Sequence, residues 1–332
     1  MRYFCTYFDY DYFTRGMALY ESLRQHCPVF TLWVLCLDQT SYDNLVGRNL
    51  PGLKLVSLAE LEQATPGLAE ARTNRSQVEF YFTCTPALPL FVLSSAPDVD
   101  LITYLDSDLY FYGDPELVFL EIGAGSVGII RHRVGPELAI VEQYGIYNVG
   151  WVSFRRDAAG LACLRWWCER CIEWCCTRIE KDRYADQKYL DFFPTRFQNV
   201  VVLEHKGANL APWNISNYRI AAGNGRATVD GQPLVFFHFN GFKQINRISY
   251  ATGLGMYGIS ADRDVLRAVY GPYIQALLKL AAQGVIRQGL LYGHRSTGPL
   301  WKRLLRPVKN FHRLAREHFR GSRIFYLFGR VL

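Results

Sequence analysis

Two carboxylates one residue apart, Asp106 and Asp108, follow an apolar run at residues 101–105 that is typical of a buried strand. In an open α/β sheet, ligands bind at the edge where such strands end. Paired carboxylate oxygens at that edge suit Mg²⁺ or Mn²⁺, ions that also bind diphosphates. A solvated Asp-Ser-Asp turn explains the same three residues, and spacing alone favours that turn. The metal interpretation therefore depends on other residues of the chain.

A further candidate ligand lies far along the chain. His238 ends a late apolar run, and a neutral imidazole can complete the coordination of an ion that two carboxylates already hold. Gly241 would let the backbone approach a ligand closely, and Lys243 offers a point charge for a phosphate. A histidine in this setting is more often structural, so the assignment depends on the aspartate pair.

Polar side chains also interrupt other predicted elements. Asn148 lies in an apolar run, where it needs a partner from the backbone or from a sugar hydroxyl. Asp186 and Gln187 stand at the start of a predicted helix at residues 185–192. They either cap this helix or hydrogen-bond a sugar and stabilise positive charge on it.

Strands that alternate with helices predict an α/β fold with a largely parallel sheet. The predicted strands are residues 4–8, 31–37, 54–58, 101–105, 126–131, 147–154, 200–203 and 234–239. The predicted helices are 13–25, 79–93, one starting at Asp114-Pro115, 157–180, 185–192 and 264–283, with a polar loop at 65–78. Pro86 and Pro89 are expected to break or kink the second helix. We expect a catalytic domain at 1–260, a helical extension at 261–300 and a basic tail at 301–332.

In their order along the chain, these motifs resemble those of nucleotide-diphospho-sugar transferases of the GT-A fold. The resemblance is to the retaining glycosyltransferases that include glycogenin and the bacterial lipooligosaccharide galactosyltransferases, and it runs from Phe4 to about Lys243. It implies a Rossmann-like, mostly parallel mixed sheet flanked by helices. It also implies metal ligands at Asp106, Asp108 and His238, catalytic residues at Asp186 and Gln187, and donor-binding residues at Tyr7, Asp9, Tyr12, Tyr104, Asn148, Gly241 and Lys243.

Two departures from the family pattern concern the diphosphate. The spacing from His238 to Lys243 is one residue shorter than usual. The helix before the aspartates carries no basic residue at 81–86, where the family has an arginine. Arg75, in the preceding loop, is one possible substitute.

The resemblance implies a metal-dependent glycosyltransferase. Its cofactor would be Mn²⁺ or Mg²⁺, its donor a nucleotide sugar, with UDP favoured, and its acceptor a glycan or lipid-linked glycan, as in lipopolysaccharide biosynthesis. Retention of anomeric configuration is implied. An inverting transferase and a non-catalytic glycan- or nucleotide-binding protein stay open as alternatives. A nucleotidyltransferase is disfavoured because residues 7–12 contain no glycine and no basic residue.

The net charge of +7 is concentrated at the end of the chain. Residues 301–330 hold nine Lys or Arg and one acidic residue, Glu317, a net charge of +8, so the rest of the chain carries −1. A helical projection separates apolar and basic faces over 301–320, which is typical of a membrane-surface helix. We expect a cytoplasmic protein, peripheral on the inner membrane face, that binds an anionic surface through this tail. A helix docked on the protein itself is the alternative, and nucleic-acid binding is disfavoured.

The first residues and the cysteines indicate the cellular compartment of the protein. Residues 1–24 show no basic region followed by an apolar one, so no signal peptide is expected, and no apolar run is long enough to span a bilayer. The nine cysteines are expected to be reduced thiols. Five of them lie on the predicted helix at 157–180, where one straight helix cannot wrap a zinc ion.

Overall fold

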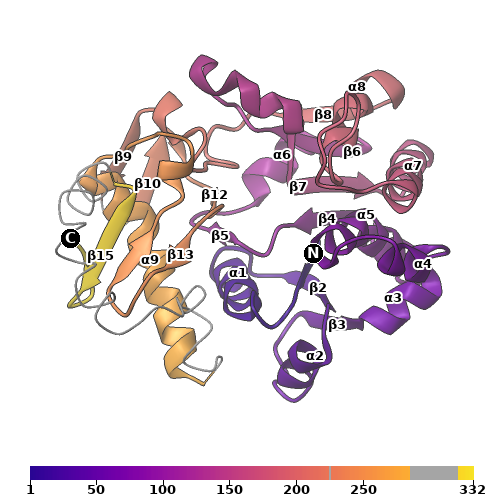
Figure 1. The fold of residues 1–332 in the computed structure, drawn as a ribbon, viewed down its shortest axis with the longest axis horizontal. Helices are drawn as coiled ribbons and strands as arrows, with labels where there is room; N and C mark the ends of the chain where they lie inside the picture. Colours follow the sequence, from indigo (N-terminus) through magenta and orange to yellow (C-terminus); the bar gives the residue numbers. More distant parts are fainter. Residues whose placement is uncertain (224–225, 285–320) are drawn as a thin grey trace.

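The computed structural model describes residues 1–223, 226–284 and 321–332, and a seven-stranded sheet forms its centre (Figure 1). The strands lie in the order β3-β2-β1-β4-β7-β6-β8. They are β1 (Arg2–Phe8), β2 (Phe30–Cys36), β3 (Leu53–Ser57), β4 (Leu101–Leu105), β6 (Val127–Arg131), β7 (Tyr147–Arg155) and β8 (Val200–Leu203). All pairs are parallel except those of β7, which is antiparallel to both of its neighbours. The predicted α/β class, with a mostly parallel mixed sheet, is confirmed.

Helices cover both faces of this sheet. They are α1 (Phe13–His26), α2 (Gln39–Val46), α3 (Leu58–Ala64), α4 (Leu68–Thr73), α5 (Gln77–Ser95), α6 (Glu116–Ile122), α7 (Ala158–Glu173), α8 (Phe193–Arg196) and α9 (Arg263–Ala282). On one face α5 packs against α7, and on the other α1 packs against α9. The short 3-10 helices are η1 (Pro136–Tyr144), η2 (Lys188–Phe192), η3 (Ile215–Asn217) and η4 (Leu254–Met256).

The central strands are buried on both sides because successive side chains point to opposite faces. In β1, Phe4 and Phe8 belong to the apolar cluster under α1, and Cys5 belongs to the cluster under α5 and α7. Trp151 of β7 is fully buried in the first cluster and contacts the rings of four phenylalanines: Phe4, Phe111, Phe119 and Phe236. Aromatic packing around Trp151 therefore joins the central sheet to the segments that carry Phe111, Phe119 and Phe236.

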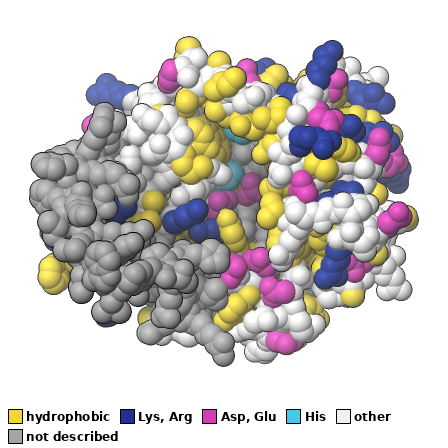
Figure 2. All heavy atoms as spheres, viewed as in Figure 1, with side chains coloured by type: hydrophobic (Ala, Val, Ile, Leu, Met, Phe, Trp, Pro, Cys, Tyr) yellow, Lys and Arg dark blue, Asp and Glu magenta, His cyan; other side chains and the backbone are white. Residues whose placement is uncertain are grey.

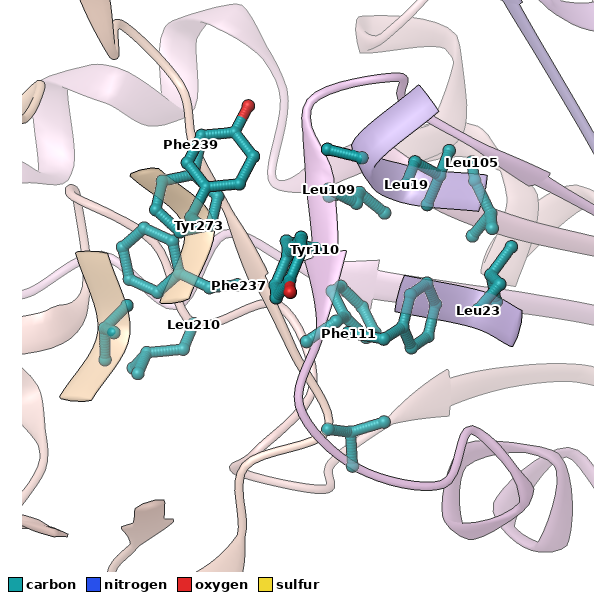
Figure 3. Packing of buried hydrophobic residues seen from close by; sticks show 14 of the residues in the cluster. Leu19, Leu23, Leu105, Leu109, Tyr110, Phe111, Leu210, Phe237, Phe239 and Tyr273 are labelled. Atoms are coloured by element: carbon teal, nitrogen blue, oxygen red, sulfur yellow. The ribbon is translucent and has the colours of Figure 1, made fainter. Parts of the chain in front are cut away.

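The remaining strands pair with one another outside the central sheet, toward α9 (Figure 1). β5 (Leu109–Phe111) pairs with β12 (Phe236–His238), and β9 (Ile220–Gly223), β10 (Arg226–Val229) and β11 (Gln232–Pro233) form a small antiparallel sheet. β13 (Lys243–Gln244), β14 (Ser249–Ala251), β15 (Arg323–Leu327) and β16 (Arg330–Val331) form another. Figure 3 shows how this region packs: Phe239 and Tyr273 of α9 lie against each other, with ring centroids 3.7 Å apart.

Three predictions of local structure need correction. The break expected at Pro86 and Pro89 does not occur, since α5 runs through both prolines, which are buried where α5 packs against α7 and the sheet. Part of the expected loop at 65–78 forms α4. The helix expected at 185–192 starts later and is a 3-10 helix: Ala185 has a φ of 47°, which a helix cannot adopt, and η2 begins at Lys188.

The predicted helix at 157–180 is shorter than expected. α7 ends at Glu173, and the guanidinium of Arg75 donates hydrogen bonds to the carbonyls of Cys171 and Ile172 in its last turn. A side chain that satisfies terminal carbonyls in this way stabilises a helix end. This contact also occupies Arg75, the residue suggested for the diphosphate.

Of the basic tail expected at 301–332, the structure describes residues 321–332. The amphipathic helix expected at 301–320 lies outside the described residues. The last residues of the expected tail form the strands β15 and β16 instead of helix, with β15 paired to β14. The helix predicted at 264–283 is α9. Within the described ranges, no helix has the length and apolar character needed to cross a bilayer.

Candidate metal and donor site

The side chains of Asp106, Asp108 and His238 meet at one edge of the central sheet. One ligand atom from each lies within 4.8 Å of the others, and no other such group of His, Cys, Asp and Glu occurs in the described part of the chain. His238 Nε2 lies 3.1 Å from Asp108 Oδ1 and 3.6 Å from Asp106 Oδ2. The structure thus brings together the three residues that the sequence assigned to a metal.

Strand pairing explains why residues so far apart in sequence meet here. β4 ends at Leu105, the Asp-Ser-Asp turn follows, and β5 then pairs with β12 so that Leu109 lies opposite His238. The backbone N–H of Phe239 donates to the carbonyl of Asp108 at 3.0 Å. The backbone N–H of His238 also donates to the carbonyl of Leu210 at 2.8 Å, so strand pairing and backbone hydrogen bonds hold His238 beside the turn.

Burial and mutual charge shift the pKa values of these three groups. The two carboxylates outweigh burial and raise the pKa of His238, and His238 lowers the pKa of Asp108. Burial raises the pKa of Asp106, although Tyr104 donates a hydrogen bond of 2.9 Å to its Oδ1. Because both carboxylates face Nε2, they favour the charged form of the His238 imidazole, which carries a hydrogen on each nitrogen, when no other cation is bound.

The donor set fits a divalent cation. Two carboxylates and one imidazole combine hard oxygen with borderline nitrogen, a set that suits Mn²⁺ and accepts Mg²⁺. The side chain of His238 is 4% exposed, whereas those of Asp106 and Asp108 are 27% and 16% exposed. The imidazole is thus buried in the protein, whereas the two carboxylates remain partly accessible to a ligand.

A pocket of about 300 Å³ opens beside the three ligands. It is lined by Tyr7, Phe8, Asp9, Tyr12, Leu37, Val78, Tyr81, Phe82, Tyr104, Asp106, Ser107, Asp108, His238 and Asn240. Figure 2 shows histidine and carboxylate side chains exposed in a central hollow of the molecular surface. Aromatic rings form much of the wall, and they supply the flat apolar surfaces on which a nucleobase or sugar can stack. The donor-binding candidates Tyr7, Asp9, Tyr12 and Tyr104 all line it.

Asp186 is 5% exposed and does not line this pocket. Burial raises its pKa to about 7, although a hydrogen bond from Thr85 opposes the shift, and the charge of Asp106 raises it further. Thr85 also contacts the hydroxyl of Tyr7 at 3.2 Å. Asp186 is therefore linked to Asp106 through charge and to the pocket residue Tyr7 through the hydroxyl of Thr85.

Replacement of Asp186 by Asn should stabilise the protein more at about pH 8 than at about pH 5. The carboxyl has a higher pKa in the folded protein than in the unfolded chain, so folding binds a proton and stability is lost as pH rises through about 7. The amide cannot ionise and removes that loss. Melting temperatures of both proteins at the two pH values test this, with Asp98→Asn, an exposed change, as the control. Equal shifts at both pH values would contradict it.

Asn148 and Gln187 form a second link to the metal candidates. Asn148 Nδ2 lies 3.4 Å from Gln187 Oε1, and Asn148 Oδ1 lies 3.2 Å from His238 Nδ1. Gln187 also donates to the carbonyl of Tyr144. The structure thus gathers Asn148, Gln187 and Asp186 around the aspartates and His238, and their roles toward a sugar stay predictions.

Gly241 and Lys243 do not line the pocket. Gly241 has a φ of 72°, a backbone conformation that favours glycine for a local reason independent of any ligand. Lys243 is exposed in β13. Their roles with a diphosphate also stay predictions.

Arg15 is a site residue that the sequence reasoning missed. Its guanidinium lies over the ring of Tyr12, donates to the carbonyl of Phe242 at 2.9 Å, and interacts electrostatically with Asp108. It thus joins α1 to the segment after His238. The signal that the sequence offered was a basic residue in the first turn of the first helix. Asn240 was missed as well, although it lies in the motif that begins at His238.

Comparison with known proteins gives two relatives in Bacillus subtilis (strain 168). The uncharacterized protein YfnD is 33% identical over 261 residues, which cover 78% of this chain and 83% of YfnD. The uncharacterized protein YfnF is 33% identical over 251 residues, which cover 73% of this chain and 82% of YfnF. No family model matches the chain.

Two solved structures are similar at greater distance. The galactosyltransferase LgtC, in complex with donor and acceptor sugar analogs, is 15% identical over 72% of this chain and 87% of that one, with a TM-score of 0.47. The glycosyltransferase GlyE of Streptococcus pneumoniae TIGR4 is 16% identical over 89% of this chain and 66% of that one, with a TM-score of 0.48. On the sequence identity to its Bacillus relatives, the chain belongs to the family of YfnD and YfnF.

Proposed function

We propose that this protein is a metal-dependent glycosyltransferase of the GT-A fold that uses a nucleotide sugar, with UDP as the favoured nucleotide. The observation that carries this proposal is the group formed by Asp106, Asp108 and His238 beside an aromatic pocket. A site of hard ligands next to stacking surfaces is suited to a diphosphate attached to a base and a sugar.

Asp106, Asp108 and His238 would hold Mn²⁺ or Mg²⁺, which supplies positive charge for the departing diphosphate. Aromatic side chains such as Tyr7 and Tyr12 would stack on the donor. Arg15 would add positive charge on the side of α1. Asn148, Asp186 and Gln187 would orient the sugar, and Asp186 in its charged form would stabilise an oxocarbenium-like transition state. Interactions that strengthen as charge develops are those that raise the rate.

Metal affinity should fall as pH falls. A metal ion and a proton compete for Nε2 of His238, and the two carboxylates raise the pKa of this imidazole above its usual value. Below that raised pKa the ion must displace the proton, so we expect affinity to weaken about tenfold for each further pH unit. Isothermal titration calorimetry with Mn²⁺ at several pH values below that pKa measures how steeply the affinity falls with pH. His238→Gln should bind weakly with a flatter pH dependence, and a flat profile in the wild type would contradict the prediction.

Thermal-shift screening of UDP-, GDP- and TDP-sugars, each with and without Mn²⁺, tests the donor. A ligand that binds only the folded state raises the melting temperature. We expect a metal-dependent shift with a UDP-sugar, followed by slow metal-dependent hydrolysis of that sugar. If no nucleotide sugar shifts the transition, the donor proposal fails. Binding without any turnover would favour a non-catalytic binding protein.

The acceptor and the stereochemistry extend the proposal. We propose a glycan or lipid-linked glycan acceptor and retention of configuration, which NMR of the new linkage tests.

We further propose that residues 301–330 hold the enzyme at an anionic membrane surface on the cytoplasmic side, because their net charge is +8. Sedimentation with vesicles that contain anionic lipid, compared with neutral vesicles, tests this. Reversal of charge at Lys302, Arg303 and Arg306 should release the protein from anionic vesicles.

A further inference from the structure

The side chain of Asn148 accepts a hydrogen bond from a backbone donor, and this fixes the orientation of its amide. Asn148 Oδ1 lies 3.1 Å from the backbone nitrogen of Gly150. A backbone N–H only donates, so the amide atom that faces it must be the carbonyl oxygen. The same Oδ1 faces His238 Nδ1 at 3.2 Å. An oxygen in this position accepts, so Nδ1 of His238 has to carry the hydrogen.

The other end of the amide leads to a second histidine. Asn148 Nδ2 lies 3.3 Å from His132 Nε2, and His132 Nδ1 lies 3.3 Å from the carbonyl of Ile146. Because Nδ2 can only donate, His132 Nε2 accepts and its Nδ1 donates to that carbonyl. Burial lowers the pKa of His132 to about 4, so this imidazole is neutral and can take both roles. The hydrogen bonds therefore all point the same way from His238 to Ile146.

An irregularity in β7 creates the backbone donor. The register between β6 and β7 shifts between Ile129 and Ile130, which pair with Val152 and Asn148. The residues between lie outside the regular pairing, as in a β-bulge, and the N–H of Gly150 turns to Asn148 instead. A Cβ on Gly150 would lie 2.6 Å from Asn148 Oδ1 and 2.8 Å from His238 Nδ1. The lack of a side chain at Gly150 thus leaves room for the Asn148–His238 contact.

We infer that Asn148 is a positioning residue that sets the tautomer of His238 through this hydrogen-bond chain. With its hydrogen on Nδ1, a neutral His238 presents the lone pair of Nε2, the atom that faces Asp106 and Asp108, to a divalent cation. Partners of this kind commonly change metal affinity when they are removed. The inference rests on the proposed metal site, and it gives Asn148 a role distinct from contact with the sugar.

Nitrogen NMR of imidazole-labelled protein tests the tautomer directly, without metal and at a pH where His238 is neutral. Two-bond nitrogen–proton spectra distinguish the Nδ1–H from the Nε2–H form, and His238→Gln identifies the signal. We expect the Nδ1–H form in the wild type and in Asn148→Asp, whose carboxylate still accepts from His238. Asn148→Ala should lose this preference. An Nε2–H form in the wild type would overturn the inference.

Mn²⁺ titration gives the second readout. We expect Asn148→Ala to weaken Mn²⁺ binding about 10- to 100-fold and Asn148→Asp to restore most of it. Asn217→Ala, an exposed change of the same kind whose side chain caps only the carbonyl of Arg133, should bind as the wild type does. Unchanged affinity in a folded Asn148→Ala also overturns the inference. If the wild type binds no Mn²⁺ at all, the proposed function fails and the tautomer measurement still stands by itself.

Discussion

Replacement of Asp108 by Asn should remove Mn²⁺ binding and lower kcat/KM by about 10³-fold, because charge stabilisation of this kind contributes several kcal/mol to the transition state. The amide keeps the shape of the carboxylate but not its charge. Asp108 Oδ1 is the ligand atom closest to His238 Nε2, at 3.1 Å, so the change also removes the main partner of that imidazole. Steady-state kinetics with a UDP-sugar and titration of Mn²⁺ measure the two effects.

Two controls separate loss of metal from loss of fold. Asp98→Asn makes the same chemical change at an exposed position shortly before β4 and should leave kinetics and Mn²⁺ affinity unchanged. Metal-free Asp108→Asn should still unfold in one cooperative transition, at a lower melting temperature than the metal-free wild type because it lacks the charge pair with His238. Full activity of Asp108→Asn, or equal activity of the wild type with and without a chelator, would exclude the metal-dependent mechanism.

Replacement of Trp151 by Ala should cost about 3–5 kcal/mol in the free energy of unfolding, the range for removal of a large ring from a packed core. Trp151 is fully buried, and its ring stacks on Phe236 with centroids 5.4 Å apart. Phe236 lies in β12, two residues before His238. The change should therefore loosen the attachment of β12 to the sheet and weaken Mn²⁺ binding together with stability.

Trp166→Ala is the matched control for this prediction. Trp166 is partly exposed on α7 and contacts Tyr189, Phe192, Phe193 and Phe197 at ring edges. Its truncation should cost less stability and leave Mn²⁺ affinity intact. Urea denaturation compares the two variants. Equal losses of stability in both would show that the ring of Trp151 has no special part in holding the sheet to β12.

Local sequence determined the elements that periodicity and capping can specify. The apolar run of β4 and the aspartates after it are contiguous, so their spacing alone predicts a strand end with two carboxylates. The helix at 264–283 is likewise visible in the period of its apolar residues, and α9 is found there. The local preference of proline, in contrast, predicted a break at Pro86 and Pro89 that α5 does not show, and packing can override such a preference.

Tertiary structure decided which distant residues meet. Pairing of β5 with β12 places His238 beside Asp108, whereas the sequence only supplied a histidine of suitable type; the resemblance to known transferases suggested the partnership. Arg75 caps α7 and Arg15 interacts with Asp108, and no local pattern distinguishes these two arginines. Local patterns are set by neighbours within a few residues, but contacts such as these depend on strand order and packing across the whole chain. The residue types were therefore written in the sequence, and their association into one site came from the fold.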